Sequence, residues 1–156
     1  MTDVIASPAG ALFALDLWHS ADPAAVAAAI SLALPAPGQA VEDERGTVLR
    51  LSRQRWWLLG DGFADLAHDS ALTDHGVISA VGGGWTRVQM TRPDWRALLM
   101  TSGLIDAEHP DFGPGSTAIS LLCHVRCVIH VRAAQACDIF VPASYTDHCL
   151  AQWRGQ

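Results

Sequence analysis

The segment from Trp85 to Tyr145 constrains the fold of this chain more than any other part of its sequence. It passes through an alternating strand pattern, an apolar helix pattern, a loop rich in proline and glycine, an apolar hairpin and a last apolar strand. At its start Val88 and Met90 share one face while Arg87 and Gln89 share the other, which is typical of a half-buried strand. No set of side chains arranged for catalysis is visible within this order. The segment therefore indicates a scaffold that assembles rather than one that reacts.

The helix after this strand carries signals at both of its ends. Thr91 is predicted to be its N-cap, with Asp94 three residues later completing a pair like a capping box. Gly103 occupies the place of a C-cap glycine. The helix is expected to bury one apolar stripe, made of Trp95, Leu98 and Leu99.

The remaining elements are predicted from periodicity and turn residues. Asp22 can cap the first helix, whose first residue is Pro23. Residues 10–81 are expected to form a strand (10–18), a helix (23–34), a polar loop (37–46), two strands (47–51 and 55–59), an acidic helix (61–74) and a strand (76–81). After the 104–116 loop we expect a hairpin (117–124 and 127–132), a strand (138–141) and a closing helix (142–153).

This element order predicts an α+β fold made of two ferredoxin-like split-βαβ units, each an antiparallel sheet with helices on one face. No sequence repeat supports a duplication, so the prediction depends on element order alone. No linker is long enough to separate two independent domains. We therefore predict a single domain over residues 1–156, with sub-units at 10–81 and 85–154.

Charge excludes several classes of function. The net charge is −6, and all ten basic residues are arginine, so chemistry that needs a lysine is impossible. The first 44 residues hold six acids and no base. No basic cluster is visible, which argues against nucleic acid and against an anionic membrane surface. The start of the chain has Asp3 and no positive segment, so we predict no secretory signal, a cytoplasmic location and reduced cysteines.

Four residues close together in sequence could suggest a metal site: Cys123, His124, Cys127 and His130. Within a hairpin, however, adjacent residues point to opposite faces, whereas zinc ligands usually lie on tight knuckles. Buried cysteines of a core strand are the favoured interpretation, and Cys137 and Cys149 are interpreted in the same way. We therefore predict no metal ligand in this chain.

Two further patterns were weighed as sites and rejected. The glycines at 82–84 precede a strand rather than a helix, so they indicate a turn and not a phosphate loop. The carboxylates of Asp106 and Glu108 lie in a loop without a partnering base or nucleophile. We predict no catalytic residue and no cofactor-binding residue.

The aromatic residues favour an interface instead. Trp56 and Trp57 are adjacent in a strand, so their side chains face opposite sides of the sheet. One can enter the core, while the other must be covered by a second layer of this chain or by another chain. Trp85 shares a face with Arg87, and exposed tryptophan beside arginine is typical of an interface hot spot. Only 17% of residues are charged, against about 25% in a typical soluble domain, which also favours a partner.

The order of several short motifs resembles one known family. They are WWLLGDG (56–62), RPDWRALL (92–99), DAEHPDFGPG (106–115), STAISLLCHVRCVIHV (116–131) and FVPASYTDHCLAQW (140–153). Together they resemble the gamma subunit family of heterotetrameric sarcosine oxidase, over about two-thirds of the chain. Cys127, and Glu108 before His109, depart from that family's pattern, and neither position has an assigned role. The first 44 residues carry none of these motifs.

The resemblance implies a fold similar to that of the aminomethyltransferase (glycine-cleavage T-protein) family. It implies a subunit without catalytic residues, in a complex with alpha, beta and delta subunits that oxidatively demethylates sarcosine. FAD, FMN, NAD and tetrahydrofolate are then expected on other subunits, and the small fourth subunit is expected to bind zinc.

Three alternatives stay open. One is the small subunit of an N-methylglutamate dehydrogenase-like complex, another is a folate-binding aminomethyltransferase-like protein that acts alone, and the third is an unrelated interaction module. The predicted partner contacts are Trp56, Trp57, Trp85, Arg87 and His109. His109 could instead fix its own loop, which is the favoured role because proline and glycine already restrict that backbone.

Overall fold

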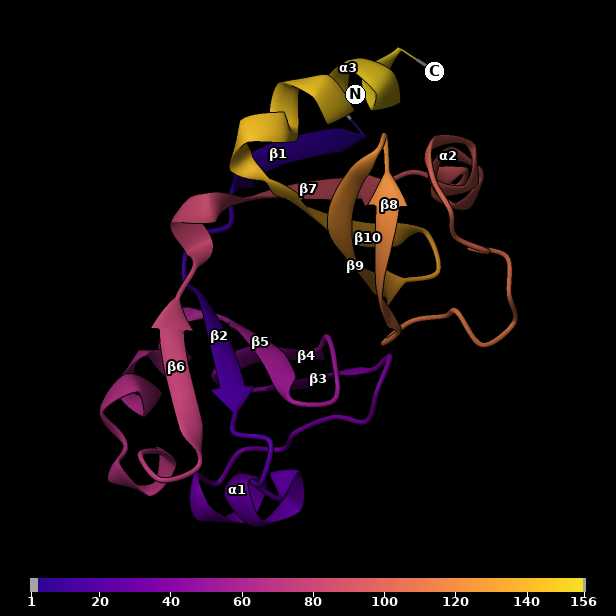
Figure 1. The fold of residues 1–156 in the computed structure, drawn as a ribbon. Coiled ribbons are helices and arrows are strands. Elements are labelled where there is room, and N and C mark those ends of the chain that lie inside the picture. The colour runs from indigo at the N-terminus through magenta and orange to yellow at the C-terminus, as the bar shows by residue number, and fades with distance from the viewer. Residues whose placement is uncertain (1–2, 156) are drawn as a thin grey trace. The chain divides into compact units, whose positions relative to one another are not determined.

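The computed structural model describes residues 3–155 and has an α+β architecture with two five-stranded antiparallel sheets (Figure 1). The α+β class and the antiparallel sheets were predicted correctly. The chain divides into two compact units. The first unit is Gly10–Gly82, and the second unit combines the residues up to Ala9 with those from Gly83 onward. The division lies next to the predicted sub-unit boundary, but the N-terminal strand belongs with the C-terminal half of the chain.

The sheet of the first unit has the strand order β3-β4-β5-β2-β6. Its strands are β2 (Leu12–Leu17), β3 (Ala40–Asp43), β4 (Gly46–Arg50), β5 (Arg55–Leu59) and β6 (Gly76–Ala80). Helix α1 (Pro23–Ala29) and the 3-10 helices η1 (Asp61–His68) and η2 (Ser70–Leu72) complete the unit. Apolar side chains from the sheet and from these helices form one core, which includes Leu15, Val48, Trp56, Leu58, Val26, Phe63 and Leu66.

The sheet of the second unit has the strand order β1-β7-β10-β9-β8. Its strands are β1 (Val4–Pro8), β7 (Trp85–Thr91), β8 (Thr117–Leu122), β9 (Val125–Ala133) and β10 (Ala136–Pro142). Helices α2 (Trp95–Ser102) and α3 (Thr146–Arg154) contribute to a single core, and the short helices η3 (Gly82–Gly84) and η4 (Ala143–Tyr145) precede β7 and α3. That core includes Val88, Met90, Ile129, Val131, Ile139, Trp95, Leu99, Leu150 and Trp153.

Both units follow the same chain path. A strand leads through a helix into a three-stranded meander, and a helical segment follows the meander. In the first unit this path runs from β2 to β5, and β6 then pairs with the other side of β2. In the second unit it runs from β7 to β10, and β1 from the N-terminus takes the place equivalent to that of β6. Each sheet has five strands, compared with four in a ferredoxin-like β-α-β-β-α-β unit.

Helix α1 begins as the sequence predicts but ends earlier. The Asp22 carboxylate accepts a hydrogen bond from the Ala24 backbone N–H at 3.2 Å, and Pro23 is the first helical residue. The helix ends at Ala29, five residues before the predicted end. Ser31 has a left-handed backbone with φ of 51°, which an α-helix cannot contain. The alanine-rich pattern therefore overestimated the length of this helix.

Three other predictions for the first half need correction. Residues 37–46, predicted as a loop, include β3, which pairs with β4. The acidic segment 61–74 forms two 3-10 helices rather than one helix. Strand β1, which pairs with β7, was not predicted at all.

Helix α2 buries the predicted stripe but has different ends. Thr91 is the last residue of β7, and the N-cap is Asp94, whose side chain makes no capping hydrogen bond. Its carboxylate instead pairs with Arg92, with an Nη2–Oδ2 distance of 2.7 Å. Gly103 is the C-cap, as predicted, and its backbone is extended rather than left-handed. A Cβ atom at this position would lie 2.2 Å from the Leu121 carbonyl oxygen, so glycine allows this segment to approach β8 closely.

Candidate partner-contact surfaces

The two adjacent tryptophans of β5 are both buried within this chain. Trp56 is 0% exposed and Trp57 is 4% exposed. The Trp56 indole lies in the core of the first unit, with the Arg50 guanidinium 4.7 Å from its ring. Trp57 lies on the opposite face of the sheet and is not part of that core, so its contact with a partner stays a prediction. Neither indole forms an exposed hot spot.

Arg87 forms an ion pair within the second unit. Its Nε donates to the Asp138 carboxylate at 2.9 Å, and Arg132 Nε donates to the other carboxylate oxygen at 2.6 Å. Asp138 is 0% exposed and lies on β10, between the strands that carry the two arginines. Burial of a carboxylate is tolerated when it is paired and hydrogen-bonded in this way. Arg87 therefore has a structural role, while contact of Arg87 and the half-buried Trp85 with a partner stays a prediction.

His109 lies in the loop between α2 and β8, with its side chain 57% exposed. Its Nδ1 accepts a hydrogen bond from the Asp111 backbone N–H at 3.2 Å. This contact supports the loop-fixing role. Because much of the ring is exposed, contact of His109 with a partner stays a prediction. In the same loop Asp106 accepts a hydrogen bond from the Glu108 backbone N–H at 3.2 Å, which gives this carboxylate a role in the turn.

Two of the motifs that carry the family resemblance are in direct contact with each other. Arg96 of α2 donates through Nη1 to the Ala107 carbonyl and, at 2.7 Å, to the Phe112 carbonyl of the loop. The Arg96 guanidinium also lies 4.4 Å from the Trp95 ring centroid, and the Trp95 and Phe112 ring centroids are 6.4 Å apart. The Arg96 guanidinium thus connects the helix motif to the loop motif.

Replacing Arg96 with alanine is expected to release this loop. A hydrogen bond from a charged donor contributes about 1.5–3 kcal/mol, and because both bonds of Arg96 share one donor nitrogen, we expect a loss of about 1.5–3 kcal/mol in the free energy of unfolding. Hydrogen exchange should accelerate across residues 104–116. Arg126, an exposed arginine of β9, is the matched control, and its replacement with alanine should change neither quantity measurably. Unchanged hydrogen exchange in the loop of the Arg96 variant would show that Arg96 does not hold the loop in place.

All four cysteines are free and buried, and their burial agrees with the interpretation of these residues as structural. Cys123 and His124 form the two-residue turn between β8 and β9, and both have positive φ angles. Cys123, Cys127 and Cys149 belong to the core of the second unit. Within residues 3–155, no group of three or more His, Cys, Asp or Glu side chains is placed to hold a metal ion.

Burial controls the reactivity of these thiols. It raises the pKa of Cys127, Cys137 and Cys149 to about 12, from 9.0. At pH 8 only about one in ten thousand such thiols is ionised, so we expect thiol reagents to label these residues only after unfolding. The folded chain holds protons that the unfolded chain releases above pH 9, so stability should decline as the pH rises from 9 towards 12. Rapid labelling of the folded chain at pH 8 would disprove the burial of these thiols.

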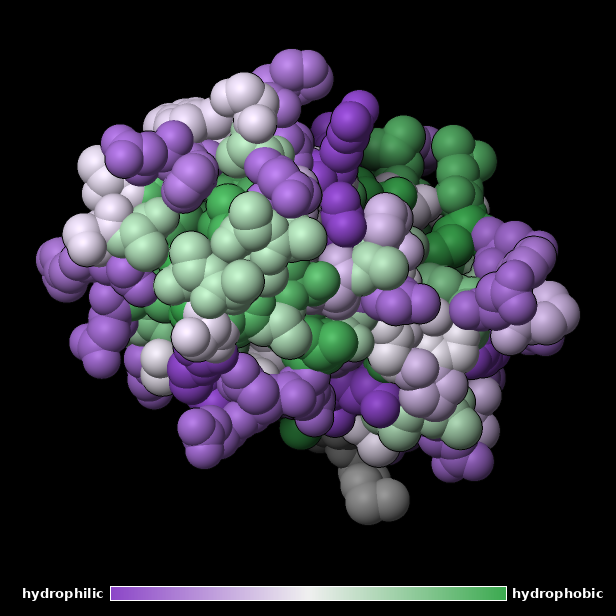
Figure 2. Space-filling model, turned by 90° about the horizontal axis from the view of Figure 1, so that it is seen from below, coloured by the Kyte–Doolittle hydropathy of each residue, from purple (hydrophilic) through white to green (hydrophobic). Residues whose placement is uncertain are grey.

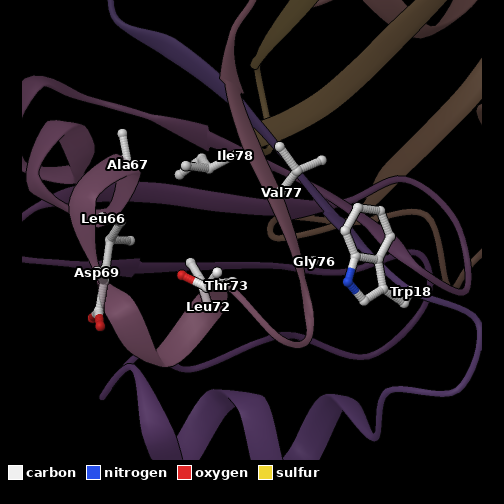
Figure 3. A pocket seen from close by; sticks show the side chains of 9 residues that line it. All are labelled: Trp18, Leu66, Ala67, Asp69, Leu72, Thr73, Gly76, Val77 and Ile78. Carbon is white, nitrogen blue, oxygen red and sulfur yellow. The ribbon is translucent and has the colours of Figure 1, made fainter.

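Exposed apolar side chains lie at two hollows that the sequence did not reveal. In the first unit, Trp18 is 47% exposed and Val77 is 43% exposed, beside a hollow of about 270 Å³ (Figure 3). In the second unit, Leu104 is 81% exposed and Leu121 is 46% exposed, beside a hollow of about 350 Å³. Figure 2, which views the molecule from below Figure 1, shows weakly hydrophobic side chains gathered on one face, on the side of α1. We therefore consider these two hollows as candidate contact surfaces.

The hollow in the first unit lies along the edge strand β6. Figure 3 shows Trp18 and Val77 on one side of β6, with Leu66, Ala67 and Ile78 on the other. Because its lining comes from both faces of the sheet, the hollow follows the edge of the strand. The strand Gly-Val-Ile-Ser-Ala contains no charge, but this pattern alone does not place it at the edge of a sheet. Within residues 3–155, no helix is both long enough and apolar enough to cross a membrane.

The comparisons with known proteins agree with this architecture. A chain of the heterotetrameric sarcosine oxidase from Corynebacterium sp. U-96, solved in complex with pyrrole 2-carboxylate, has a similar fold with a TM-score of 0.82. It is 22% identical to this chain, and the match covers 96% of this chain and 80% of that one. A comparison with curated proteins found no match. The family described as sarcosine oxidase, gamma subunit matches residues 16–154, which extends the resemblance into the first 44 residues. This chain therefore belongs to the sarcosine oxidase gamma subunit family.

Proposed function

We propose that this chain is the gamma subunit of a heterotetrameric flavoenzyme that oxidatively demethylates sarcosine. Its role is to provide contact surface for the larger subunits rather than a reacting group. The observation that carries this proposal is the family match over residues 16–154, together with a likeness in fold that covers 96% of the chain.

The exposed apolar side chains support an assembly role. Trp18, Leu104 and Leu121 are each at least 46% exposed. Large apolar groups at a hollow gain free energy when a partner removes them from water, at about 25 cal/mol per Å². Tryptophan in particular is enriched among the residues that dominate binding energies. Burial of these side chains against other subunits gives a physical reason for their exposure in the single chain.

The partners in this proposal are alpha, beta and delta subunits, with FAD, FMN, NAD and tetrahydrofolate bound by those subunits. The glycines at 82–84 support this assignment of the cofactors to other subunits. They form a short 3-10 turn that leads into β7, whereas a dinucleotide phosphate needs the N-terminus of a helix. We also infer that the fold is related to that of the aminomethyltransferase family, as the resemblance to the gamma subunit family implies. A cytoplasmic location follows from the proposed complex.

Co-purification tests this function. The tagged chain is isolated from its native host, the bound proteins are identified by mass spectrometry, and the absorbance of bound flavin is recorded. We expect large flavin-containing subunits in the same fraction, together with sarcosine-dependent oxidation. Activity with N-methylglutamate instead of sarcosine would assign the chain to the related dehydrogenase complex. Recovery as a lone protein that binds tetrahydrofolate would overturn the subunit proposal.

A further inference from the structure

Strand β6 presents backbone hydrogen-bonding groups at the end of its sheet. The Trp18 N–H donates to the His75 carbonyl at 2.7 Å, and the Val81 N–H donates to the Leu12 carbonyl at 2.9 Å. Since backbone groups of successive strand residues point to alternate sides, the groups of Val77 and Ser79 also face β2. Those of Gly76, Ile78 and Ala80 point away from the sheet, because β6 is its last strand.

The other three edge strands within residues 3–155 carry features that discourage pairing. Strand β1 ends at Pro8, and β3 ends with Glu42 and Asp43. Strand β8 is partly covered, because Leu104 N–H donates to the Leu121 carbonyl at 3.1 Å. Proline, charge and covering segments are the usual protections of a sheet edge. Strand β6 contains neither proline nor a charged residue. Its edge is thus the one best suited to pair with another strand.

The surroundings of this edge are apolar next to the strand and acidic beyond it. The hollow along β6 is lined by Trp18, Val77, Leu66 and Leu72, with Asp69 as its single charged residue. The segment 61–74 contributes four acids and no arginine. Across the first unit, nine acids face four arginines. Arg45 and Arg55 pair with Asp43 and Asp16, and not with the acids of segment 61–74.

We propose that β6 accepts an extended segment of a partner subunit as a sixth strand of this sheet. The segment would bond to the outward groups of Gly76, Ile78 and Ala80, while alternate apolar side chains enter the hollow beside Trp18. Strand addition of this type obtains affinity from main-chain hydrogen bonds and specificity from side-chain pockets. At least one arginine or lysine next to the apolar residues of the segment would match the four acids of segment 61–74. This inference rests on the proposed function, because the segment belongs to a subunit of the same complex.

Hydrogen exchange measured by residue-resolved mass spectrometry tests the pairing directly. Exchange is compared between the isolated full chain and the co-purified complex. We expect the outward amides of Ile78 and Ala80 to exchange at least tenfold more slowly in the complex. The amides of Val77 and Ser79 should change less, since they already bond to β2. A complex that forms without slower exchange at Ile78 and Ala80 would overturn strand addition and leave the subunit assignment intact. The absence of any complex would overturn both.

A pair of substitutions at Ala80 separates the backbone from the side chain. Ala80→Pro removes an N–H that faces away from β2, so it should leave the sheet intact but block the added strand. Recovery of the large subunits should fall at least tenfold. Ala80→Thr retains the N–H and should stay within twofold of the wild type. Equal recovery with both variants, or equal loss with both, contradicts the proposal. Thermal unfolding of each isolated variant identifies misfolding, and in that case the exchange result decides.

Charge complementarity has its own matched variants. Asp65→Asn with Asp69→Asn removes two charges near β6, and the new amide at 69 still accepts the Ala71 N–H. Glu42→Gln with Glu44→Gln makes the same change in net charge at the opposite edge of the sheet. We expect the first pair to lower recovery of the partner and to flatten its salt dependence, and the second pair to do neither. Equal effects of the two pairs would contradict a basic segment at β6.

Discussion

Replacing Asp138 with alanine is expected to lower the free energy of unfolding by about 3–5 kcal/mol. The carboxylate is 0% exposed and binds Arg87 and Arg132, whose side chains are only 28% and 29% exposed. Its removal leaves two partly buried positive charges side by side with no counter-charge. The cost is then the desolvation of these charges plus their repulsion. Chemical denaturation measures the loss, with the same dependence of the free energy of unfolding on denaturant concentration used for both proteins.

The pair of Arg55 and Asp16 provides the matched control for this prediction. Its Nε–Oδ1 distance is 2.5 Å, but its side chains are 54% and 30% exposed. Exposed ion pairs contribute about 0–1 kcal/mol, so Arg55→Ala should be nearly silent. A loss below about 1 kcal/mol for Asp138→Ala, similar to that of the control, would show that burial does not determine the strength of the Asp138 cluster.

Replacing Trp95 with alanine is expected to cost about 3–5 kcal/mol, the usual range for a large aromatic side chain in a core. Trp95 is 0% exposed, and its Nε1 donates to the Ala134 carbonyl at 3.0 Å. The substitution would also remove the ring next to Phe112 and Arg96, so the 104–116 loop should exchange faster. Trp95→Phe retains an aromatic ring but loses the hydrogen bond, and it should cost less than the alanine variant. Equal losses for the two variants would contradict the packing role of the indole.

The second half of the fold was predictable because long periodic segments alternate with clear turn residues. Strands β7, β9 and β10 and helix α2 were all expected close to their observed positions. The missed strands are short and locally ambiguous. Strand β1 contains serine and proline, and β3 ends in acids, so neither shows strong alternation. Strand β1 forms by pairing with β7, which lies far away in sequence, and β3 forms by pairing with β4 across a short turn.

The contact residues were harder to predict than the fold. For Trp56 and Trp57 the sequence left open whether a second layer of this chain or another chain covers the outer indole, and four consecutive positions of β5 are buried. A continuous apolar run such as Trp-Trp-Leu-Leu indicates a strand covered on both faces, but it does not say which segment or chain provides the second cover. The edge at β6 depends on strand order, which no local pattern contains. The roles of Arg87 and Asp138 likewise depend on pairing between strands that lie far apart in sequence.

Native mass spectrometry of the complex isolated through a tag on its largest subunit tests the central claim most directly. If this chain is a structural subunit of the flavoenzyme, it will be present in a fixed ratio of one copy per large subunit. It will remain bound through exchange into low and moderate salt. A large subunit that carries its flavins, oxidises sarcosine and contains no trace of this chain would contradict the claim.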